Sequence, residues 1–384
     1  MAGLLVAAEL IDEARRATGL DRFDSDSFLD GLEILVADLN RGERPEAGRA
    51  RLRAGMVKAL ADRLKTTAYL DGRPELLERS CERPVFVFGV PRTGTTLLSN
   101  LLAADPARRS PLAWEIDDPV PPPTRAGLFT DPRALSRLEA HRQMLAARPE
   151  LGKYYRTSPI YPNECMFFIA HDFKALMWEG RDRLPNYRDW LFHEADLRST
   201  YRYHKRFLQL LQAEAPGIWN LKMPSHGLWL ETLVETYPDA RLVWTHRDPL
   251  AATGSFCSLM TLAPRLAGGA IDYRWIGENY SWQAVEHAER IMNARAKLGE
   301  DRIIDVHYAE LMRDPIGTMR TLYRSLGDEL GPEAETGMRA WLDDNPQEKF
   351  GKHEYRLAQY GLTPEGLRPR FERYLSRYEV EAEG

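Results

Sequence analysis

The feature that most constrains the fold of this chain is a short apolar run that leads into a glycine-containing loop and then into a helical pattern. The run covers Val85–Phe88, and Gly89 and Gly94 lie in the loop that follows it. A continuous apolar strand is typical of a parallel sheet that helices cover on both faces. A loop that opens a helix directs backbone N–H groups and the positive end of the helix dipole at one point, so it favours an anion.

Further short apolar runs predict more strands of the same sheet. They lie at residues 218–223, 241–245 and 302–306, and each precedes a turn and a helical pattern, as at 228–235 and 316–326. Strands that alternate with helices indicate βαβ units, in which helices connect parallel strands and cover both faces. The predicted fold class is therefore α/β, a three-layer αβα arrangement around a central parallel sheet.

The chain is predicted to have two parts. Residues 1–82 form an N-terminal helical region, because apolar residues such as those between Phe28 and Leu39 recur at helical spacing. Residues 83–384 form the α/β domain. A helical, aromatic-rich insert at about 107–215 separates the first predicted strand from the second.

Charge and cysteine content exclude several classes of protein. The net charge is −5, from 52 lysines and arginines against 57 aspartates and glutamates, which argues against nucleic acid as a partner. The three cysteines form no CxxC pair, so neither a disulfide framework nor a metal site is expected. No apolar run reaches 18 residues and the N-terminus does not resemble a signal peptide, so we expect no membrane span and a cytoplasmic location.

The loop after the first strand carries residue types that bind phosphate. Arg92 offers a fixed charge that can hold an anion in bidentate fashion, and Thr93, Thr95 and Thr96 add hydroxyl donors. Gly94 lets the backbone approach a ligand closely. The loop is close to the P-loop motif of nucleoside triphosphatases, but Thr95 stands where that motif has lysine. It therefore suits a single terminal anionic group without an obligatory metal; the alternative is a threonine-capped helix start with no ligand.

A second strand end carries another candidate anion site. The strand at 241–245 is followed by Arg247 and Asp248, and Pro249 favours the first turn of a helix in which Ser255 lies about two turns along. Because ligands of open α/β sheets bind beyond the carboxyl ends of the strands, Arg247 is placed to meet one. The alternative is an Arg–Asp ion pair that closes the turn.

Together the PRTGTT sequence of the loop and the THRDP sequence after the later strand resemble the PAPS-dependent sulfotransferases, in particular their bacterial branch. The resemblance covers roughly residues 84–380. It implies the P-loop NTPase-like sulfotransferase fold, 3′-phosphoadenosine-5′-phosphosulfate (PAPS) as co-substrate and no required metal. The first loop would bind the 5′-phosphosulfate, the second motif the 3′-phosphate, and a C-terminal glycine–lysine segment would close over the nucleotide. The implied nucleotide-binding residues are Arg92, Thr93, Gly94, Thr95, Thr96, Arg247, Ser255, Gly351, Lys352 and His353.

The resemblance also implies residues for the transfer itself. Lys222 can stabilise the leaving group or supply a proton. Arg92 keeps a positive charge where the cytosolic relatives have lysine, although an arginine hardly deprotonates. The base is Glu115 or His226, and Glu115 is favoured, because the histidine of cytosolic relatives follows their lysine by two residues, where this chain has Pro224. In structural roles instead, Lys222 would face solvent, Glu115 would cap a helix or form an ion pair, and His226 would be a turn residue.

The acceptor and two rival functions stay open at this stage. Aromatic side chains of the insert can line a site for a small-molecule hydroxyl acceptor, apolar or aromatic, or they can form ordinary helical core. A P-loop-like kinase would need lysine at position 95 and an acidic strand end. A non-catalytic nucleotide-binding relative would have no need of Glu115, Lys222 and Arg247 together.

Overall fold

The computed structural model describes residues 4–42, 45–148, 158–266, 270–346 and 356–383. The chain forms two compact units. The first comprises Met1–Cys81, Ala113–Ser136 and Cys165–Pro216, and the second comprises Glu82–Leu112, Arg137–Glu164 and Gly217–Gly384. The division at residue 82 into a helical region and an α/β domain stays a prediction, and each compact unit is described by itself.

Helices make up the regular structure of the first unit, in the part of it that the structure describes. Helix α2 (Leu29–Leu39) covers the pattern between Phe28 and Leu39 that predicted a helix and buries its apolar residues, and α3 (Glu46–Asp71) follows it. The buried guanidinium of Arg63 on α3 is paired with Asp24 and Asp172, both at 2.7 Å. The elements are α1 (Ala7–Thr18), α2 (Leu29–Leu39), α3 (Glu46–Asp71), η1 (Pro74–Glu78), α5 (Ala113–Asp117), α7 (Met166–Ile169), η3 (Ala170–Asp172), α8 (Leu176–Glu179), α9 (Pro185–His193) and α10 (Arg198–Leu211).

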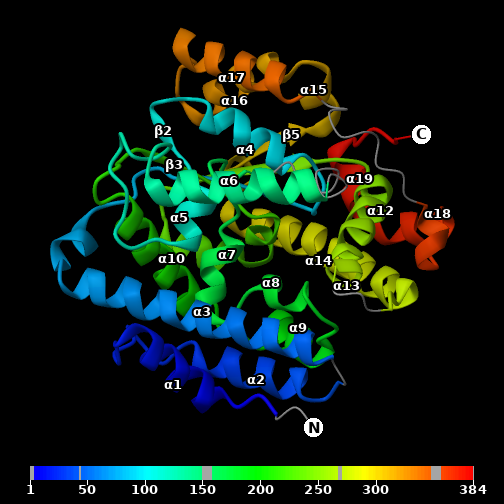
Figure 1. Cartoon of the computed structure of the whole chain (residues 1–384). Helices are drawn as coiled ribbons and strands as arrows, with labels where there is room; N and C mark the ends of the chain where they lie inside the picture. The colour runs from blue at the N-terminus through cyan, green and yellow to red at the C-terminus, as the bar shows by residue number, and fades with distance from the viewer. Residues whose placement is uncertain (1–3, 43–44, 149–157, 267–269, 347–355, 384) are drawn as a thin grey trace. The chain divides into compact units, whose positions relative to one another are not determined.

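The second unit contains a parallel sheet with strand order β2-β3-β1-β4-β5. The strands are β1 (Val85–Gly89), β2 (Arg108–Arg109), β3 (Ile218–Lys222), β4 (Arg241–His246) and β5 (Ile303–His307). The other elements are α4 (Thr95–Ala103), η4 (Pro224–Trp229), α11 (Leu230–Thr236), α12 (Pro249–Met260), α13 (Leu262–Leu266), α14 (Tyr273–Leu298), η5 (Glu300–Arg302), α15 (Tyr308–Arg313), α16 (Pro315–Leu326), α17 (Pro332–Asp344), η6 (Leu357–Tyr360), α18 (Pro364–Leu367), η7 (Arg368–Phe371) and α19 (Glu372–Tyr378). Helix α6 (Pro132–Ala147), which is labelled in Figure 1, has residues in both units.

The predicted α/β fold with a central parallel sheet is confirmed. The four expected strands form within two residues of their predicted bounds, and the predicted helix at 316–326 is α16. The sequence missed β2, because its two residues are both arginines and carry no apolar signal. Among the described residues, no helix combines the length and the apolar character that a bilayer span requires.

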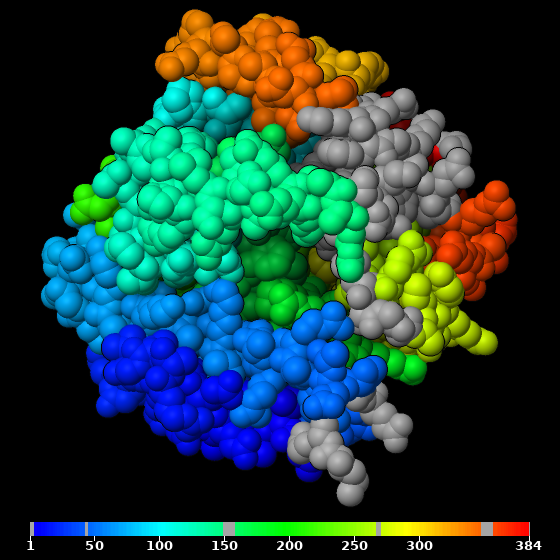
Figure 2. All heavy atoms as spheres, viewed as in Figure 1, coloured from blue at the N-terminus to red at the C-terminus, as the bar shows by residue number. Residues whose placement is uncertain are grey.

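One face of the sheet is covered by α4, α16 and α17. In the space-filling view the outer sides of α16 and α17 form the surface at the top (Figure 2). Their inner sides carry Met319 and Met338, which are fully buried. Each of these helices therefore has the one apolar side that a helix needs to cover a sheet.

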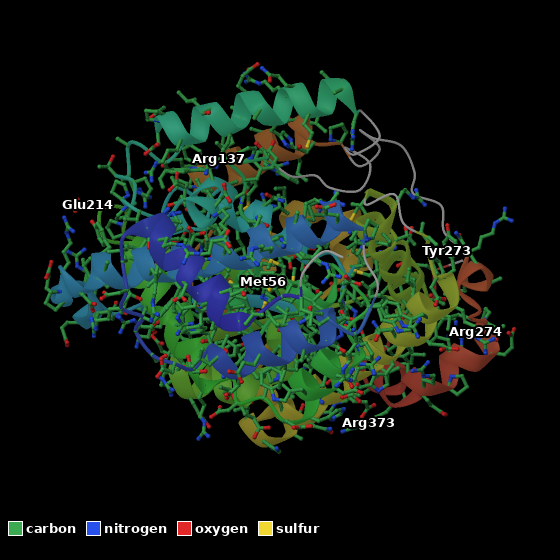
Figure 3. The ribbon with its side chains drawn as sticks, turned by 60° about the horizontal axis from the view of Figure 1, so that its bottom comes forward. Met56, Arg137, Glu214, Tyr273, Arg274 and Arg373 are labelled. Carbon is green, nitrogen blue, oxygen red and sulfur yellow. The ribbon has the colours of Figure 1, made fainter. Side chains whose placement is uncertain are left out.

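The other face is covered by η4 and α14. Phe86 of β1 meets the ring of His226 in η4 edge-on, with 5.0 Å between ring centroids. Helix α14 also contacts α19. Arg373 of α19 donates through Nη1 to two residues of α14, Glu289 Oε2 at 2.6 Å and Asn293 Oδ1 at 2.9 Å. Arg373 lies at the surface (Figure 3).

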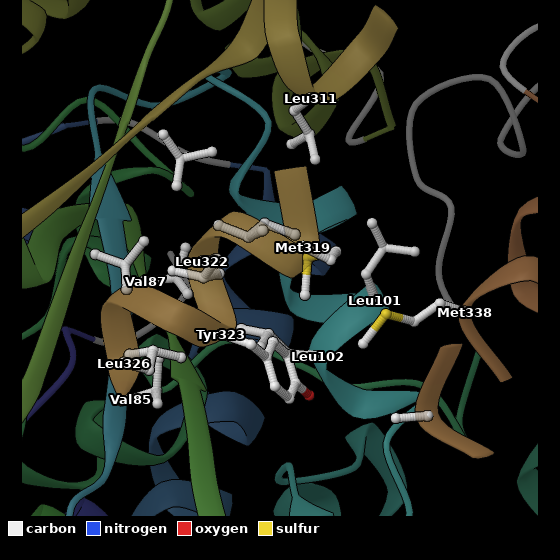
Figure 4. Close-up of a cluster of buried hydrophobic side chains, with 14 of the residues drawn as sticks. Val85, Val87, Leu101, Leu102, Leu311, Met319, Leu322, Tyr323, Leu326 and Met338 are labelled. Carbon is white, nitrogen blue, oxygen red and sulfur yellow. The ribbon is translucent and has the colours of Figure 1, made fainter. Parts of the chain in front are cut away.

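Alternation along β1 explains how both faces become core. Val85 and Val87 point to the side of α4 and α16, where they pack with Leu101, Met319 and Leu326 (Figure 4). Because successive side chains of a strand point to opposite faces, Phe86 lies on the side of η4. A strand with both faces buried needs an apolar residue at every position, which is the pattern that predicted it.

Candidate active site

Three predicted site residues of the second unit lie at the carboxyl ends of adjacent parallel strands. Arg92 follows β1, Lys222 ends β3, and Arg247 follows β4. Tyr308 follows β5 at the same edge. The register aligns Val87 with Lys222, so the two strand ends are side by side. Parallel pairing thus gathers residues that are more than a hundred positions apart in the sequence, at the edge where α/β sheets bind ligands.

The loop between β1 and α4 has two residues in the left-handed backbone region. Arg92 has φ 75° and Gly94 has φ 93°. A Cβ atom at Gly94 would lie 2.8 Å from Cδ2 of Tyr308, so glycine is required there for space as well as for conformation. Gly94 is the N-cap of α4 and provides no side-chain hydrogen bond to the first turn. The N–H groups of that turn are those that helices use to bind anions.

Thr93 holds the loop to the neighbouring strand. Its side chain is fully buried, and Oγ1 donates to the carbonyl of Val90 at 2.8 Å. The same oxygen lies 2.6 Å from Oγ1 of Thr245 on β4. Thr95 is also buried, whereas Thr96 is exposed. The three threonines therefore differ: the Thr93 hydroxyl is buried between the loop and β4, whereas Thr96 is exposed in the first turn of α4.

The two predicted anion sites are directly linked. Arg92 Nε donates to Oγ of Ser255 at 3.0 Å, and Arg247 Nη1 donates to the carbonyl of Arg92 at 2.9 Å. Asp248 caps α12 by accepting from the N–H of Leu250 at 2.9 Å. Arg92, Arg247 and Ser255 thus form one connected cluster.

Two contacts of Arg247 escaped the sequence analysis. Its guanidinium lies over the ring of Tyr308, 4.4 Å from the centroid. Its Nε and Nη2 atoms donate to the two carboxylate oxygens of Glu383, at 2.6 and 2.7 Å. Neither partner belongs to a local motif, and no spacing in the sequence connects position 247 with position 383.

Lys222 is buried and ion-paired. Its side chain is 6% exposed, and Nζ lies 2.7 Å from Oε1 of Glu164, whose side chain is 23% exposed. Nζ also donates to Oγ1 of Thr96 at 3.5 Å. The solvent-facing alternative for Lys222 is wrong. Glu164 is a second residue that the sequence analysis missed, since it lies in the insert without any motif around it.

The two candidate bases have different surroundings. His226 in η4 is fully buried against Phe86. Glu115 belongs to α5 of the first unit and is also fully buried. The hydrogen bond with Asp131 is the main cause of the raised pKa of Arg133, and the nearby Glu115 contributes to it. The predicted residues Gly351, Lys352 and His353 lie outside the described residues.

A polar network supports the end of β4 next to Arg247: His246 and Arg295 are buried, and Asp305 is partly exposed. His246 Nε2 lies 2.8 Å from Oδ1 of Asp305, and Arg295 donates to both oxygens of that carboxylate. Burial acts to raise the pKa of Asp305, but the hydrogen bonds from His246 and Arg295 outweigh it and lower this pKa to about 2. Burial lowers the pKa of His246. Near neutral pH the network therefore holds a neutral imidazole and a charged carboxylate, and fixes the strand from which Arg247 extends.

Comparison with known proteins agrees with this geometry. Residues 84–332 match the Sulfotransferase family. Among solved structures, the chain is 41% identical to sulfotransferase STF9 from Mycobacterium avium, over 100% of this chain and 99% of that one, with a TM-score of 0.93. It is 31% identical to sulfotransferase STF1 from Mycobacterium tuberculosis, over 96% and 98% of the chains, with a TM-score of 0.84.

A curated relative is more distant. Omega-hydroxy-beta-dihydromenaquinone-9 sulfotransferase Stf3 from Mycobacterium bovis is 24% identical over 299 residues, which are 76% of this chain and 74% of that protein. The family match covers more than half of this chain, and the similarity to STF9 extends over its whole length. The resemblance inferred from the two motifs is confirmed: the chain belongs to the sulfotransferase family.

Proposed function

We propose that this sulfotransferase uses PAPS as the donor and transfers the sulfuryl group to a hydroxyl group of a small apolar or aromatic acceptor, with release of adenosine 3′,5′-bisphosphate. The observation that carries the proposal is the cluster at the carboxyl ends of β1, β3 and β4. There Arg92, Lys222 and Arg247 supply three positive charges beside the start of α4, whose first turn has no side-chain cap.

The two ends of the donor are assigned to different parts of this cluster. The loop from Arg92 to Thr96 would hold the 5′-phosphosulfate, since its glycine and the N–H groups of α4 suit an anion that approaches the backbone. Arg247 and Ser255 would hold the 3′-phosphate. A phosphate accepts two parallel hydrogen bonds from one guanidinium edge, and Arg247 presents such an edge through Nε and Nη2. Gly351, Lys352 and His353 remain proposed nucleotide contacts.

PAPS would supply a sulfuryl group that forms a bond to the acceptor oxygen while its bond to the 5′-phosphate oxygen breaks and leaves the electron pair there. Lys222 would then stabilise the charge on that oxygen, and its buried position makes the stabilisation stronger than in water. Arg92 would add charge without donating a proton. Glu164 would orient Lys222 through the ion pair of 2.7 Å.

The proton of the acceptor hydroxyl needs a base. We keep Glu115 as the proposed base and His226 as the alternative. A carboxylate is one of the side chains that serve as general bases, and Glu115 is fully buried. His226 is also fully buried and packs against Phe86, a setting that also suits a purely structural histidine. The name of the Mycobacterium bovis relative includes a hydroxylated menaquinone, which supports an apolar acceptor that carries a hydroxyl group.

The test of the donor is a calorimetric titration with adenosine 3′,5′-bisphosphate, together with transfer of labelled sulfate from PAPS to a panel of phenols and long-chain alcohols. Arg247→Met should weaken bisphosphate binding by at least about tenfold, because hydrogen bonds to charged groups contribute about 1.5–3 kcal/mol. Arg274→Met is the matched control, since Arg274 has the same charge but an 85% exposed side chain on α14. Tight binding of ATP with Mg²⁺ and none of the bisphosphate would instead indicate a kinase.

The test of the base compares two substitutions. Glu115→Gln should leave the affinity for the bisphosphate nearly unchanged and lower kcat about 10²–10⁴-fold, the usual contribution of a general base. His226→Gln should lower kcat much less. The opposite ranking would assign the base to His226, and wild-type protein that binds the nucleotide but transfers no sulfate to any acceptor would favour a non-catalytic relative.

A further inference from the structure

The guanidinium of Arg247 is held in place by the protein on two sides. Nη1 donates to the carbonyl of Arg92 at 2.9 Å, and the face of the group lies on the ring of Tyr308. These contacts leave the edge formed by Nε and Nη2. That edge is the one that donates to both carboxylate oxygens of Glu383, at 2.6 and 2.7 Å. A carboxylate and a phosphate use this edge in the same bidentate way, so they would exclude each other.

The segment that carries Glu383 is attached at a second point. The backbone N–H of Glu383 donates to Oδ2 of Asp248 at 2.8 Å, while Oδ1 of Asp248 caps α12. The preceding helix, α19, is fixed to β4, since the hydroxyl of Tyr374 lies 3.1 Å from Nδ1 of His246 and Tyr378 packs edge-on against Trp244. Helix α19 therefore delivers residues 379–383 to the end of β4, next to Arg247.

We propose that Glu383 is an internal competitor for the anion site at Arg247, so that residues 379–383 must leave this position before a nucleotide with a 3′-phosphate binds there. The inference rests on the proposed function. The Arg247 side chain is 14% exposed and that of Glu383 is 38% exposed, so water reaches the pair and weakens it. A phosphate, with more charge than a carboxylate, can displace Glu383, and the contact lowers nucleotide affinity without abolishing it.

The magnitude follows from population arithmetic. If the contact is closed in most molecules, the apparent dissociation constant of the nucleotide equals its intrinsic value divided by the open fraction. A partly exposed ion pair with bidentate geometry keeps the open fraction at about 0.1–0.3. Removal of the carboxylate should therefore tighten binding about threefold to tenfold.

The experiment compares Glu383→Gln and Glu383→Ala with the wild type in calorimetric titrations. Glu381→Gln is the matched control. Glu381 lies two residues before Glu383, its side chain is exposed, and the substitution removes the same charge. Two ligands are used: adenosine 3′,5′-bisphosphate, and adenosine 5′-phosphate, which lacks the 3′-phosphate. We expect both Glu383 variants to bind the bisphosphate about threefold to tenfold more tightly, and to bind the 5′-phosphate as the wild type does. Glu381→Gln should match the wild type with both ligands.

Unchanged or weaker bisphosphate binding by both Glu383 variants would overturn the inference, and so would an equal gain in Glu381→Gln. If neither the wild type nor any variant binds the bisphosphate, the proposed function fails and this inference falls with it. A wild type that binds while the variants show no gain overturns the inference alone. As an independent measurement, amide exchange at Glu383 should become faster when the wild type is saturated with bisphosphate, since its N–H then loses Asp248.

Discussion

The substitution Gly94→Ala tests whether the loop conformation between β1 and α4 is needed for both folding and anion binding. Gly94 has φ 93°, and a Cβ atom there would lie 2.8 Å from Cδ2 and 3.4 Å from Cε2 of Tyr308. Gly361 provides the matched control in the same unit. It has φ 68°, but the nearest atom to its added Cβ is Cγ of Arg274 at 4.0 Å. Both sites impose a left-handed backbone on alanine, and only Gly94 adds a steric clash.

The expected magnitudes follow from this difference. A left-handed backbone costs an alanine about 1–2 kcal/mol, so Gly361→Ala should lower the free energy of unfolding by about 1 kcal/mol. At Gly94 the carbon atoms would be about 0.7 Å closer than the usual 3.5–4.0 Å contact. Overpacking of this kind typically costs about 1–3 kcal/mol, since the ring of Tyr308 lies under the guanidinium of Arg247 and has little room to move. The total for Gly94→Ala is then about 3 kcal/mol.

Urea denaturation followed by tryptophan fluorescence measures the free energies of unfolding, and calorimetry measures bisphosphate affinity. Gly361→Ala should bind the nucleotide like the wild type. Gly94→Ala should bind at least about tenfold more weakly, because a shift of the loop moves the N–H groups of α4 away from the anion. The reasoning is refuted if the two variants lose the same stability and bind the nucleotide equally well.

Four further outcomes follow from the described contacts. Thr93→Val should lower the free energy of unfolding by about 1–2 kcal/mol, because it removes the buried hydroxyl that joins the loop to β4. Thr93→Ser keeps the hydroxyl and should retain most of the wild-type stability. Equal losses of stability in a urea titration would contradict this expectation. Burial lowers the pKa of His204 to about 3 and that of His287 to about 4, below the usual 6.5, so the unfolded chain binds more protons below about pH 6.5. As the pH is lowered from about 6.5 to about 4, each of these histidines should reduce the free energy of unfolding by about 1.4 kcal/mol per pH unit. His287→Gln should make the measured dependence on pH less steep. Glu164→Gln should lower kcat about tenfold with little change in bisphosphate affinity. Lys222→Met should lower kcat about 10²–10³-fold. A larger effect of Glu164→Gln than of Lys222→Met would mean that Glu164 does more than orient the lysine. EDTA should leave the rate of sulfate transfer unchanged, and a loss of activity that Mg²⁺ restores would count against a metal-free site.

Local patterns in the sequence were enough to predict β1, β3, β4 and β5 and the glycine-containing loop between β1 and α4. An apolar residue at every position of Val85–Phe88 is what a strand buried on both faces requires, and Gly94 is what the turn into α4 requires. The start of α12 at Pro249 was predicted for the same kind of reason, because proline and the capping Asp248 act within one turn of the chain. Such features depend on neighbours in the sequence, so they can be read from it.

The tertiary structure alone decided which side chains meet. Lys222 was recognised, but its partner Glu164 was not, since a pairing across 58 positions leaves no periodic or local signal. Thr93, Thr95 and Thr96 look equivalent in the sequence, and only the proximity of Thr245 on the neighbouring strand buries the hydroxyl of Thr93 inside the protein. The contact of Glu383 with Arg247 depends on where α19 packs against β4. Long-range contacts of this kind arise from the packing of helices on a parallel sheet, and no segment of the chain specifies them by itself.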